Sequence, residues 1–302
     1  EYPMLDTEFP TIDWKHPYEL TAGERDVIER METAFRNCEK LQKHMRLLLD
    51  KGGLYKIYNG NLLFHGCIPL NEDGSLKEIQ IYGKKYKGRE LYDVLETYVR
   101  RAFFAVDSME QRKGMDILWF IWASPSSPLF GKDKMTTFER YFIADKETHK
   151  ETKGAYYHLL ENEEVVDTLL QEFDLSPENG HIINGHVPVH QGEGESPVKC
   201  NGKVIVIDGG FCKAYQKVTG IAGYTLIYNS YGLILSAHEP FTSKEDAVSK
   251  ESDIVSNRVS VHYTSKRRLV GDTDTGKALR ERIEELMQLL DAYRKGYIKE
   301  KK

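Results

Sequence analysis

The chain has 302 residues, of which 40% are hydrophobic and 29% are charged, a composition typical of a globular protein. The formal net charge of −5 lacks the basic excess of nucleic-acid-binding proteins, so we expect no nucleic-acid partner. No apolar run is long enough to cross a bilayer, and the first residues lack the pattern of a signal peptide, so we expect no membrane partner. The four cysteines have no CxxC spacing, which indicates reduced thiols and a cytoplasmic location.

The N-terminal part of the chain predicts an irregular arm followed by a long helix. Residues 1–20 have little periodicity and contain three prolines. Thr21 and Glu24 have the spacing of a capping box, and apolar residues then recur every three or four positions as far as Leu48. We expect one helix that begins after Thr21 and ends at Gly52-Gly53, since glycine commonly terminates helices.

The next segments predict a hairpin, a second helix and a buried strand. Asn59-Gly60 lies between the apolar runs 54–58 and 61–64, which is a strong hairpin signal because both turn positions need positive φ. Residues 88–104 have apolar positions at helical spacing. The short apolar run 117–122 predicts a buried strand. The polar residues 126–160 predict a long excursion with a functional role or high mobility.

The C-terminal half predicts alternating strands and helices, followed by clustered strands. The expected elements are a helix at 161–173, strands at 181–184 and 203–207, a hairpin of 224–229 and 232–237, a strand at 254–264 and a helix at 275–295. Gly271–Lys277 resembles a phosphate-binding loop, but residue 278 is not Ser or Thr, so we interpret it as the capped start of the last helix. Together these elements predict an α/β fold with a mixed sheet, a strand-rich C-terminal region and a terminal helix.

Two predicted strands end in the same way, in a histidine beside a glycine. Strand 61–64 is followed by His65-Gly66, and strand 181–184 is followed by Gly185-His186. Ligand sites in open α/β sheets lie beyond the carboxyl ends of the strands, and neutral imidazole binds Zn, Mn and Fe well. Asp208, after strand 203–207, would add a carboxylate to the same edge. These residues alone leave open whether the histidines bind metal or are structural.

Longer strings around these positions resemble known enzymes. Residues 60–69 (GNLLFHGCIP) and 184–188 (NGHVP) resemble two metal-ligand blocks of the calcineurin-like metallophosphoesterases, and residues 118–125 (LWFIWASP) resemble the Trp-x-x-Pro segment between those blocks. A more specific resemblance, to the class III fructose-1,6-bisphosphatases, extends from about Asp6 to Lys295. It is carried by residues 207–216 (IDGGFCKAYQ), 219–226 (TGIAGYTL) and 238–241 (HEPF).

The resemblance implies both a fold and an activity. Residues 1–240 would form the C-terminal half of a metallophosphoesterase-like αββα sandwich with an excursion at 126–160, and residues 241–302 would form a strand-rich extension with a terminal helix. His65 and His186 would bind metal, usually Mn, with two ions in the full-length enzyme. That enzyme would hydrolyse the 1-phosphate of fructose 1,6-bisphosphate to give fructose 6-phosphate and phosphate in gluconeogenesis. No residue of this chain is assigned a catalytic role.

Four further residues are candidates for binding or supporting roles. Arg140 and Lys213 are expected to hold the sugar phosphate, since cations bind phosphate oxygens well. Asp208 and His190 are expected to contact the metal ligands rather than the metal. A ligand role for His190 is the less favoured alternative, because it follows His186 by four residues, whereas the second histidine of some metallophosphoesterases follows by two.

The chain departs from the family pattern in one respect. The blocks Asp-x-His, Gly-Asp-x-x-Asp-Arg and Gly-Asn-His-Asp/Glu, which supply most ligands including the bridging carboxylate, do not occur in it. The first residue is also Glu rather than Met. We therefore expect the C-terminal portion of a longer protein, with the N-terminal portion as its partner. A catalytic metal site normally has at least three protein ligands, so we expect weak metal binding and little or no phosphatase activity from this chain alone.

Two other interpretations stay open. The first is another phosphatase of the same superfamily, acting on diadenosine polyphosphates or proteins, which the strings KAYQ and AGYT disfavour. The second is a non-catalytic regulatory or oligomerisation module that acts through residues 126–160 or the last helix. The apolar side of that helix, with Ile283, Leu286 and Leu290, is compatible with a homo-oligomer.

Overall fold

The structure, a computed structural model, describes residues 2–209, 211–241, 243–251 and 256–299. Contacts between residues divide the chain into two compact units. The first unit comprises Glu1–Leu54 and Cys67–Tyr157, and the second comprises Tyr55–Gly66 and His158–Lys302. Both units are therefore built from segments that are discontinuous in sequence.

The first unit begins with an arm and two helices, α1 (Ala22–Arg36) and α2 (Glu39–Lys51). The capping box is confirmed: Thr21 Oγ1 accepts from the backbone nitrogen of Glu24, and the Glu24 carboxylate accepts from the backbone nitrogen of Thr21. The single helix expected here is wrong, because α1 ends at Asn37 and the chain is extended at Cys38. The apolar spacing continues through this break, whereas asparagine at position 37 is a poor helix former.

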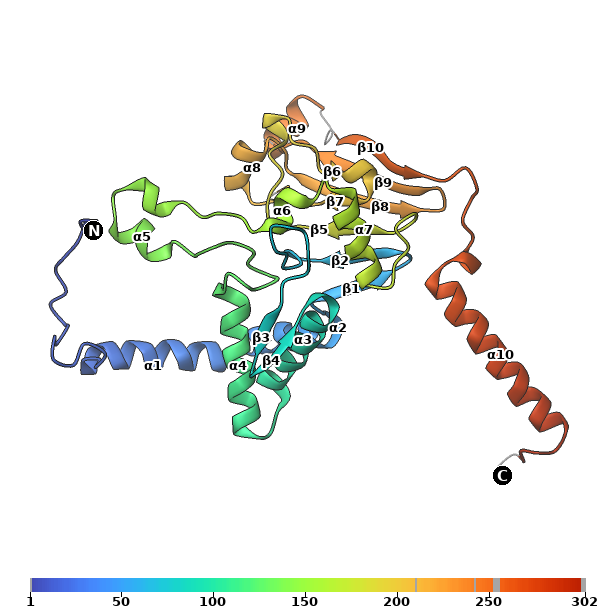
Figure 1. Ribbon diagram of the computed structural model, residues 1–302, viewed down its shortest axis with the longest axis horizontal. Coiled ribbons are helices and arrows are strands. Elements are labelled where there is room, and N and C mark those ends of the chain that lie inside the picture. The colour runs from blue at the N-terminus through green and yellow to red at the C-terminus, as the bar shows by residue number, and fades with distance from the viewer. Residues whose placement is uncertain (1, 210, 242, 252–255, 300–302) are drawn as a thin grey trace. The chain divides into compact units, whose positions relative to one another are not determined.

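A helical hairpin forms the core of the first unit. Helices α3 (Gly88–Phe104) and α4 (Ser108–Ala123) pack side by side (Figure 1) and, with the hairpin β3 (Ile79–Ile81) and β4 (Lys84–Tyr86), enclose a hydrophobic core. Its buried members are Ile79, Ile81, Leu91, Leu95, Ile117 and Ile121. The helix expected at 88–104 is confirmed, but the strand expected at 117–122 is wrong.

The reason for that error lies in the start and the faces of α4. Asp107 caps the helix, with its carboxylate accepting from the backbone nitrogens of Met109 at 3.0 Å and Glu110 at 2.9 Å. The last two turns of α4 are apolar on nearly every side, so the run resembles a buried strand when only its apolar character is considered. The remaining elements of the excursion are α5 (Thr137–Phe142), η1 (Lys146–His149) and α6 (Ala155–Leu159).

The second unit contains a five-stranded mixed sheet with the strand order β1-β2-β5-β7-β6. Its strands are β1 (Tyr55–Tyr58), β2 (Asn61–Phe64), β5 (His181–Asn184), β6 (Val198–Lys199) and β7 (Val204–Val206). Strands β2, β5 and β7 are parallel, whereas β1 and β6 pair antiparallel at the edges. The expected mixed α/β sheet is therefore confirmed, and the central strand β5 is buried along its whole length, as parallel strands usually are.

The β1–β2 turn and the helix before β5 also match the sequence predictions. The hairpin expected at Asn59-Gly60 is confirmed, with φ of 51° and 79° at the two turn residues. The helix expected at 161–173 is confirmed as α7 (Glu163–Glu172). Lys203, before β7, bonds Glu163 and Asp167 of α7 at 2.8 and 2.5 Å, which ties this helix to the sheet.

A second sheet of three antiparallel strands, in the order β10-β9-β8, follows in the chain. Its strands are β8 (Gly223–Asn229), β9 (Gly232–His238) and β10 (Ser256–Tyr263), as expected, although residues 254 and 255 of the expected last strand lie outside the described residues. The other elements are η2 (Gln191–Glu193), η3 (Cys200–Gly202), α8 (Lys213–Thr219), α9 (Lys244–Ser249) and η4 (Val270–Asp272).

The terminal helix α10 (Asp274–Arg294) begins where the sequence predicts. Thr273 Oγ1 accepts from the backbone nitrogen of Gly276 at 3.1 Å, so the loop that resembles a phosphate-binding loop is the cap of this helix. The β1–β2 turn anchors the same end, because the backbone nitrogen and side chain of Asn59 both hydrogen-bond Asp274.

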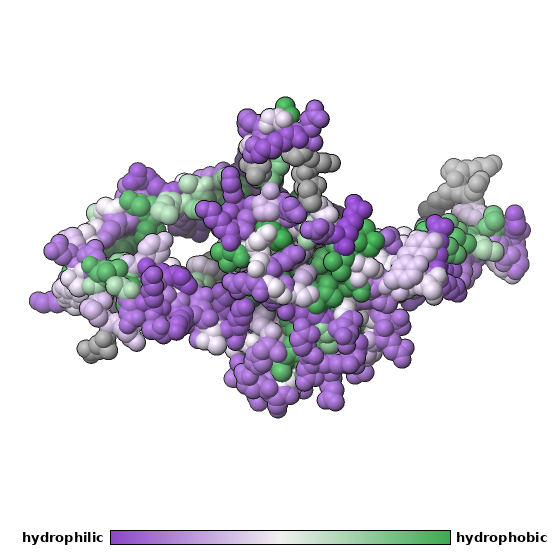
Figure 2. Space-filling view, turned by 90° about the horizontal axis from the view of Figure 1, so that it is seen from above, coloured by the Kyte–Doolittle hydropathy of each residue, from purple (hydrophilic) through white to green (hydrophobic). Residues whose placement is uncertain are grey.

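Two properties of the surface follow from the described residues. None of their helices is both long enough and apolar enough to cross a membrane. Hydrophobic side chains nevertheless reach the surface in several separate patches among polar residues (Figure 2). Such patches on a folded chain commonly mark contacts with another polypeptide.

Candidate metal centre

Two parallel strands deliver the two predicted histidines to one place. Strands β2 and β5 pair in register, with Leu63 opposite Ile183, and each is followed directly by a histidine loop. The loops are tied together: the backbone nitrogen of Gly185 donates to the carbonyl oxygen of His65 at 2.9 Å. Parallel pairing therefore brings His65 and His186, 121 positions apart, to the same edge of the sheet.

The imidazoles of His65 and His186 converge within the second unit. Nε2 of His65 lies 3.1 Å from Nδ1 of His186, and the ring centroids are 5.0 Å apart with the rings at 70°. The His65 side chain is exposed and that of His186 is partly buried. As a hydrogen bond, this contact needs a proton on one of the two nitrogens. The same separation also suits two nitrogen ligands of one ion that are each about 2.1 Å from it and roughly at a right angle.

The backbone of His186 adopts an uncommon conformation. Its φ is 70°, in the left-handed region that a residue with a β-carbon seldom occupies. Such conformations cost free energy, and they cluster at functional sites because the surrounding structure must enforce them. The backbone nitrogen of Val187 donates to the carbonyl oxygen of Gly185 at 2.9 Å, so His186 is the central residue of a tight turn directly after β5.

Asp208 reaches the same edge from the third parallel strand. It follows β7, and a β-carbon added at Gly185 would lie 3.6 Å from Cβ of Asp208. Its carbonyl oxygen accepts from the backbone nitrogen of Val189 at 2.9 Å, so it supports the loop after His186. Among the described residues, however, no three His, Cys, Asp or Glu side chains are grouped closely enough to hold a metal ion. The donors present therefore fit part of a metal site.

The residue between strand and loop, Asn184, has a role that sequence reasoning missed. Its buried side-chain nitrogen donates to the carbonyl oxygen of Gly66 at 3.2 Å, a second link between the two histidine loops. Its side-chain oxygen is buried without a hydrogen-bond partner in the described part of the chain. An amide directly after the two buried isoleucines of β5 was the signal that could have identified it.

The other candidates of the second unit lie on loops and at a helix start. His190 Nδ1 lies 3.5 Å from the carboxylate of Glu193, and the backbone nitrogen of His190 donates to the Glu195 carboxylate at 3.0 Å. Lys213 is the first residue of α8, and its side chain is exposed. The structure thus places His190 in a loop network and Lys213 in contact with solvent.

Arg140 belongs to the first unit and supports the excursion. Its Nε donates to Thr136 Oγ1 at 3.0 Å, and its Nη2 donates to the carbonyl oxygen of His149 at 3.1 Å. Thr136 also binds Glu151, a carboxylate paired with Lys132 at 2.8 Å. Burial opposes ionisation of Glu151, but hydrogen bonds from Lys132 and Thr136 outweigh it and lower its pKa to about 2. Arg140 is therefore part of a network that orders residues 132–151.

Cys67, next to the first histidine loop in sequence, is a buried thiol of the first unit. Burial raises its pKa to about 12, despite a hydrogen bond with Tyr157 that acts in the opposite sense. The thiol is protonated at neutral pH, so it lacks the thiolate that binds metals or attacks substrates. Cys67 is therefore a small core residue of the first unit.

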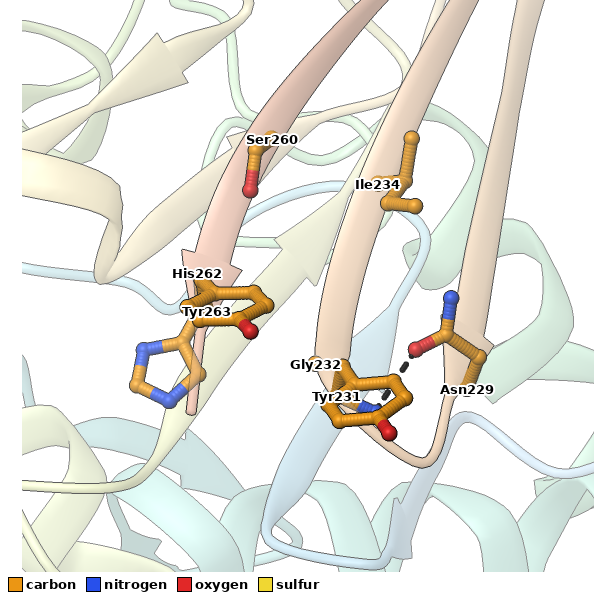
Figure 3. Close-up of a pocket in the computed structure, with 7 residues that line it drawn as sticks. All are labelled: Asn229, Tyr231, Gly232, Ile234, Ser260, His262 and Tyr263. Atoms are coloured by element: carbon orange, nitrogen blue, oxygen red, sulfur yellow. Dashed lines mark hydrogen bonds between the residues drawn. The ribbon is translucent and has the colours of Figure 1, made fainter. Parts of the chain in front are cut away.

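A separate cavity of about 250 Å³ lies beside the β8–β9 turn (Figure 3). It is lined by Asn229, Tyr231, Gly232, Ile234, Ser260, His262 and Tyr263. Asn229 Oδ1 accepts from the backbone nitrogen of Tyr231 at 2.8 Å, and the rings of Tyr231 and Tyr263 are parallel within 10° at 6.1 Å. None of these residues was a predicted site residue.

The cavity lies away from the histidine pair, at the other end of β5. His262 packs its ring on His181, the first residue of β5, with 5.0 Å between the centroids. Burial lowers the pKa of His181 to about 4, and the charges of His262 and Arg268 act in the same direction. His181 is thus a neutral core histidine, whereas His186 follows the carboxyl end of the same strand, where ligand sites of α/β sheets occur.

The fold and these residues define a mixed α/β protein that presents a histidine pair at the carboxyl edge of its parallel strands. The chain belongs to the Firmicute fructose-1,6-bisphosphatase family, whose model matches residues 1–295. The resemblance seen in the sequence is therefore confirmed.

Curated relatives agree with this assignment. The chain is 57% identical over 300 residues to a protein of Clostridioides difficile (strain 630) and 54% identical over 300 residues to one of Clostridium botulinum (strain Loch Maree / Type A3). Both are named fructose-1,6-bisphosphatase class 3, and each match covers 99% of this chain but 45% of the relative. The chain thus spans less than half the length of these relatives. No solved structure matches it significantly.

Proposed function

We propose that this chain is the C-terminal portion of a metal-dependent fructose-1,6-bisphosphatase, and that it contributes His65 and His186 to the metal centre of that enzyme. The observation that carries the proposal is the 3.1 Å approach of the two imidazole nitrogens at the ends of parallel strands. The names of the relatives support hydrolysis of fructose 1,6-bisphosphate, with gluconeogenesis as the corresponding pathway.

Each candidate residue has a role in this proposal. His65 and His186 hold the metal, preferably Mn, with two ions in the complete enzyme. When bound, such ions supply an activated hydroxide and stabilise the phosphate oxygens during in-line displacement. Asp208 and His190 maintain the loop that presents His186. Lys213 binds the sugar phosphate, because an exposed ammonium group at a helix start can reach a ligand. Arg140 is a weaker candidate for phosphate binding, since its guanidinium already binds Thr136 and the His149 carbonyl.

The metal centre is completed by a complementary segment, which we define as the part of the relatives that this chain does not match. Two imidazoles alone make a weak chelate, and a catalytic site keeps at least three protein ligands. The exposed side chain of His65 leaves this edge of the sheet accessible to a further polypeptide. The segment would carry the Asp-x-His, Gly-Asp-x-x-Asp-Arg and Gly-Asn-His-Asp/Glu blocks, and the chain alone would bind metal weakly and have little or no activity.

We further propose a metallophosphoesterase-like fold and a cytoplasmic location for this chain. Residues 1–240 would form half of a metallophosphoesterase-like αββα sandwich, and 241–302 its extension. The parallel core β2-β5-β7 with histidines at its carboxyl edge supports this arrangement. Strand β10, which pairs with β9, would join the extension to the larger part. The four free cysteines support a cytoplasmic location, because disulfides are rare there.

A second candidate function is oligomerisation through α10. Leu279, Ile283, Leu286 and Leu290 follow one another at spacings of four, three and four residues, and are 48–55% exposed. This spacing is typical of a helix that packs against another helix. Removal of residues after Gly271 would then abolish assembly without changing metal binding.

The direct test is phosphate release by this chain co-expressed with the complementary segment of the Clostridioides difficile relative. We expect Mn-dependent hydrolysis of fructose 1,6-bisphosphate by the complex and its loss in His65→Ala, with His44→Ala as the matched control on exposed helix α2. A preference for diadenosine tetraphosphate or a phosphopeptide would favour another phosphatase class. Full activity of the His65→Ala complex would refute the proposed role of the histidine pair.

A further inference from the structure

Helix α4 has two apolar faces that lie next to each other around its axis. Its first apolar face carries Gly114, Ile117 and Ile121, which are buried against α3 and the β3–β4 hairpin. The second carries Met115, Leu118, Trp119 and Trp122, which recur at spacings of three, one and three residues. A helix that is hydrophobic on all sides is normally buried on all sides. The first apolar face of α4 packs against other elements of the first unit. The exposure of the second apolar face therefore needs an explanation.

The covered face is packed as closely as two helices allow. A β-carbon added at Gly114 would lie 2.3 Å from the backbone nitrogen of Ala102 and 2.6 Å from the carbonyl oxygen of Tyr98, both on α3. Ile117 and Ile121 are 5% and 6% exposed. Rotation of α4 about its axis is therefore excluded, because Gly114 fits against α3 in only one orientation. The second face cannot turn inward to bury its side chains.

The second face, which we call the Trp face, is left open within the described part of the chain. Trp119 is 67% exposed, Trp122 is 59% exposed, and Met115 and Leu118 are 50% and 42% exposed. The two indoles pack edge to face, with their centroids 5.1 Å apart. With about 150–250 Å² of surface on a fully exposed aromatic side chain, the two tryptophans alone expose on the order of 250 Å².

The composition of the Trp face is that of a protein interface. Tryptophan is enriched at the energetic centre of interfaces, and apolar centres are commonly surrounded by charged residues. Arg112 and Asp116, on the same side of α4, form such a charged border with an ion pair of 3.2 Å. A small-molecule site is less consistent with these residues, since the face is convex, on the outside of one helix, whereas small-molecule sites are concave.

We propose that the Trp face is the surface on which the complementary segment docks. The occupant follows from the relatives: this chain covers 45% of each, so more than half of their polypeptide remains to cover surfaces of this chain. This docking surface rests on the proposed function in one respect, namely that the complementary segment exists and completes the metal centre. Docking through α4 would secure the segment by hydrophobic contact, independently of the histidine pair.

The test is capture of this chain by the tagged complementary segment of the Clostridioides difficile relative after co-expression. Trp119→Gln combined with Trp122→Gln should reduce the captured amount by roughly tenfold or more, since central interface tryptophans dominate binding. The matched control is Trp14→Gln, a tryptophan that is 76% exposed and lies in the N-terminal arm. That change should leave capture unaltered. Trp119→Phe combined with Trp122→Phe should retain most of the capture.

A second measurement separates loss of contact from loss of folding. Circular dichroism and thermal unfolding of the glutamine variants should match the parent chain, because both side chains point to solvent. In a chain labelled with 5-fluorotryptophan, the fluorine resonances of Trp119 and Trp122 should shift in the complex while that of Trp14 stays in place. Unchanged resonances at residues 119 and 122 would overturn the proposal.

Further outcomes of these experiments distinguish the docking surface from the proposed function. Equal capture of the glutamine variants, or no capture of the parent chain, would overturn the docking surface. A parent chain that is a dimer by itself and becomes a monomer in the glutamine variants would assign the Trp face to a second copy instead. Capture that depends on the Trp face in a complex without phosphate release would refute the proposed function alone. Phosphate release by a normally assembled glutamine variant would refute the docking surface alone.

Discussion

His65 Nε2 and His186 Nδ1 lie 3.1 Å apart because each follows one of two paired parallel strands. The two residues do not reach this contact in the same way. His186 needs a left-handed backbone with φ of 70°, whereas His65 continues from β2 without positive φ. The backbone at position 186 is therefore strained whereas that at position 65 is not, and this difference can be tested without any added metal.

Replacement of His186 by glycine should yield a more stable chain than replacement by alanine. Both changes remove the imidazole, so they differ mainly in the cost of a β-carbon in the left-handed region, about 1 kcal/mol. At position 65 the order should reverse, because glycine loses more backbone entropy on folding. The free energy of unfolding in urea measures all four variants. Equal free energies of unfolding for His186→Ala and His186→Gly would show that the backbone at position 186 is unstrained.

Gly114→Ala should destabilise the helical hairpin of the first unit. The added β-carbon would approach the Ala102 nitrogen to 2.3 Å, so α3 and α4 must separate, and such overpacking costs about 1–3 kcal/mol. Gly23→Ala is the matched control, since that helical glycine has nothing within 4 Å. The control should stabilise α1 by about 0.5–1 kcal/mol. Thermal unfolding of both variants tests the pair, and a neutral Gly114→Ala would contradict the close packing.

The buried His181 should make stability fall in mild acid. Its pKa is lowered to about 4 in the folded chain, against an ordinary value of 6.5. Between these values the unfolded chain binds a proton that the folded chain does not, so the contribution is complete above pH 6.5 and is lost toward pH 4. From pH 6.5 to pH 4, the free energy of unfolding of the parent chain should therefore fall by roughly 2–3 kcal/mol more than that of His181→Gln. Parallel pH profiles for both proteins would argue against a buried neutral histidine.

Arg140 and Lys213 should behave differently when each is changed to alanine. Arg140→Ala removes the hydrogen bonds to Thr136 and to the His149 carbonyl, and should lower the free energy of unfolding by about 1–2 kcal/mol. Lys213→Ala should leave stability unchanged, since this side chain is exposed. In the co-expressed complex, Lys213→Ala should raise KM for fructose 1,6-bisphosphate roughly tenfold through loss of a charge-assisted hydrogen bond. An unaltered KM would exclude Lys213 from phosphate binding.

The sequence predicted best those elements whose local signals agree with their packing. The Asn59-Gly60 turn, helix α3 and the capped start of the last helix were all confirmed, because turn residues, apolar period and caps point to the same structure. The predictions were wrong where the hydrophobic pattern alone suggested a different element from the one that forms. Helix α4 was predicted as a strand because both of its faces are apolar, and the break at Asn37 was missed because the apolar period continues across it.

The site was predictable in part for similar reasons. Strand ends followed by His-Gly or Gly-His identify candidate ligands, and parallel pairing brings them together. Local sequence could not reveal that Asn184 links the two loops, since that hydrogen bond joins positions 118 residues apart. Nor could it reveal that Arg140 is engaged within the excursion, because its partner His149 is reached only after residues 137–149 fold back.

The central claim is that the histidine pair is one part of a metal centre that needs a second polypeptide segment. The most direct measurement is the Mn content retained after extensive dialysis by the chain alone and by the chain co-expressed with the complementary segment. We predict that the chain alone loses its metal, and that the complex retains a stoichiometric amount that disappears in His65→Ala and His186→Ala. Stoichiometric Mn retained by the chain alone, together with robust phosphate release from fructose 1,6-bisphosphate, would contradict the account.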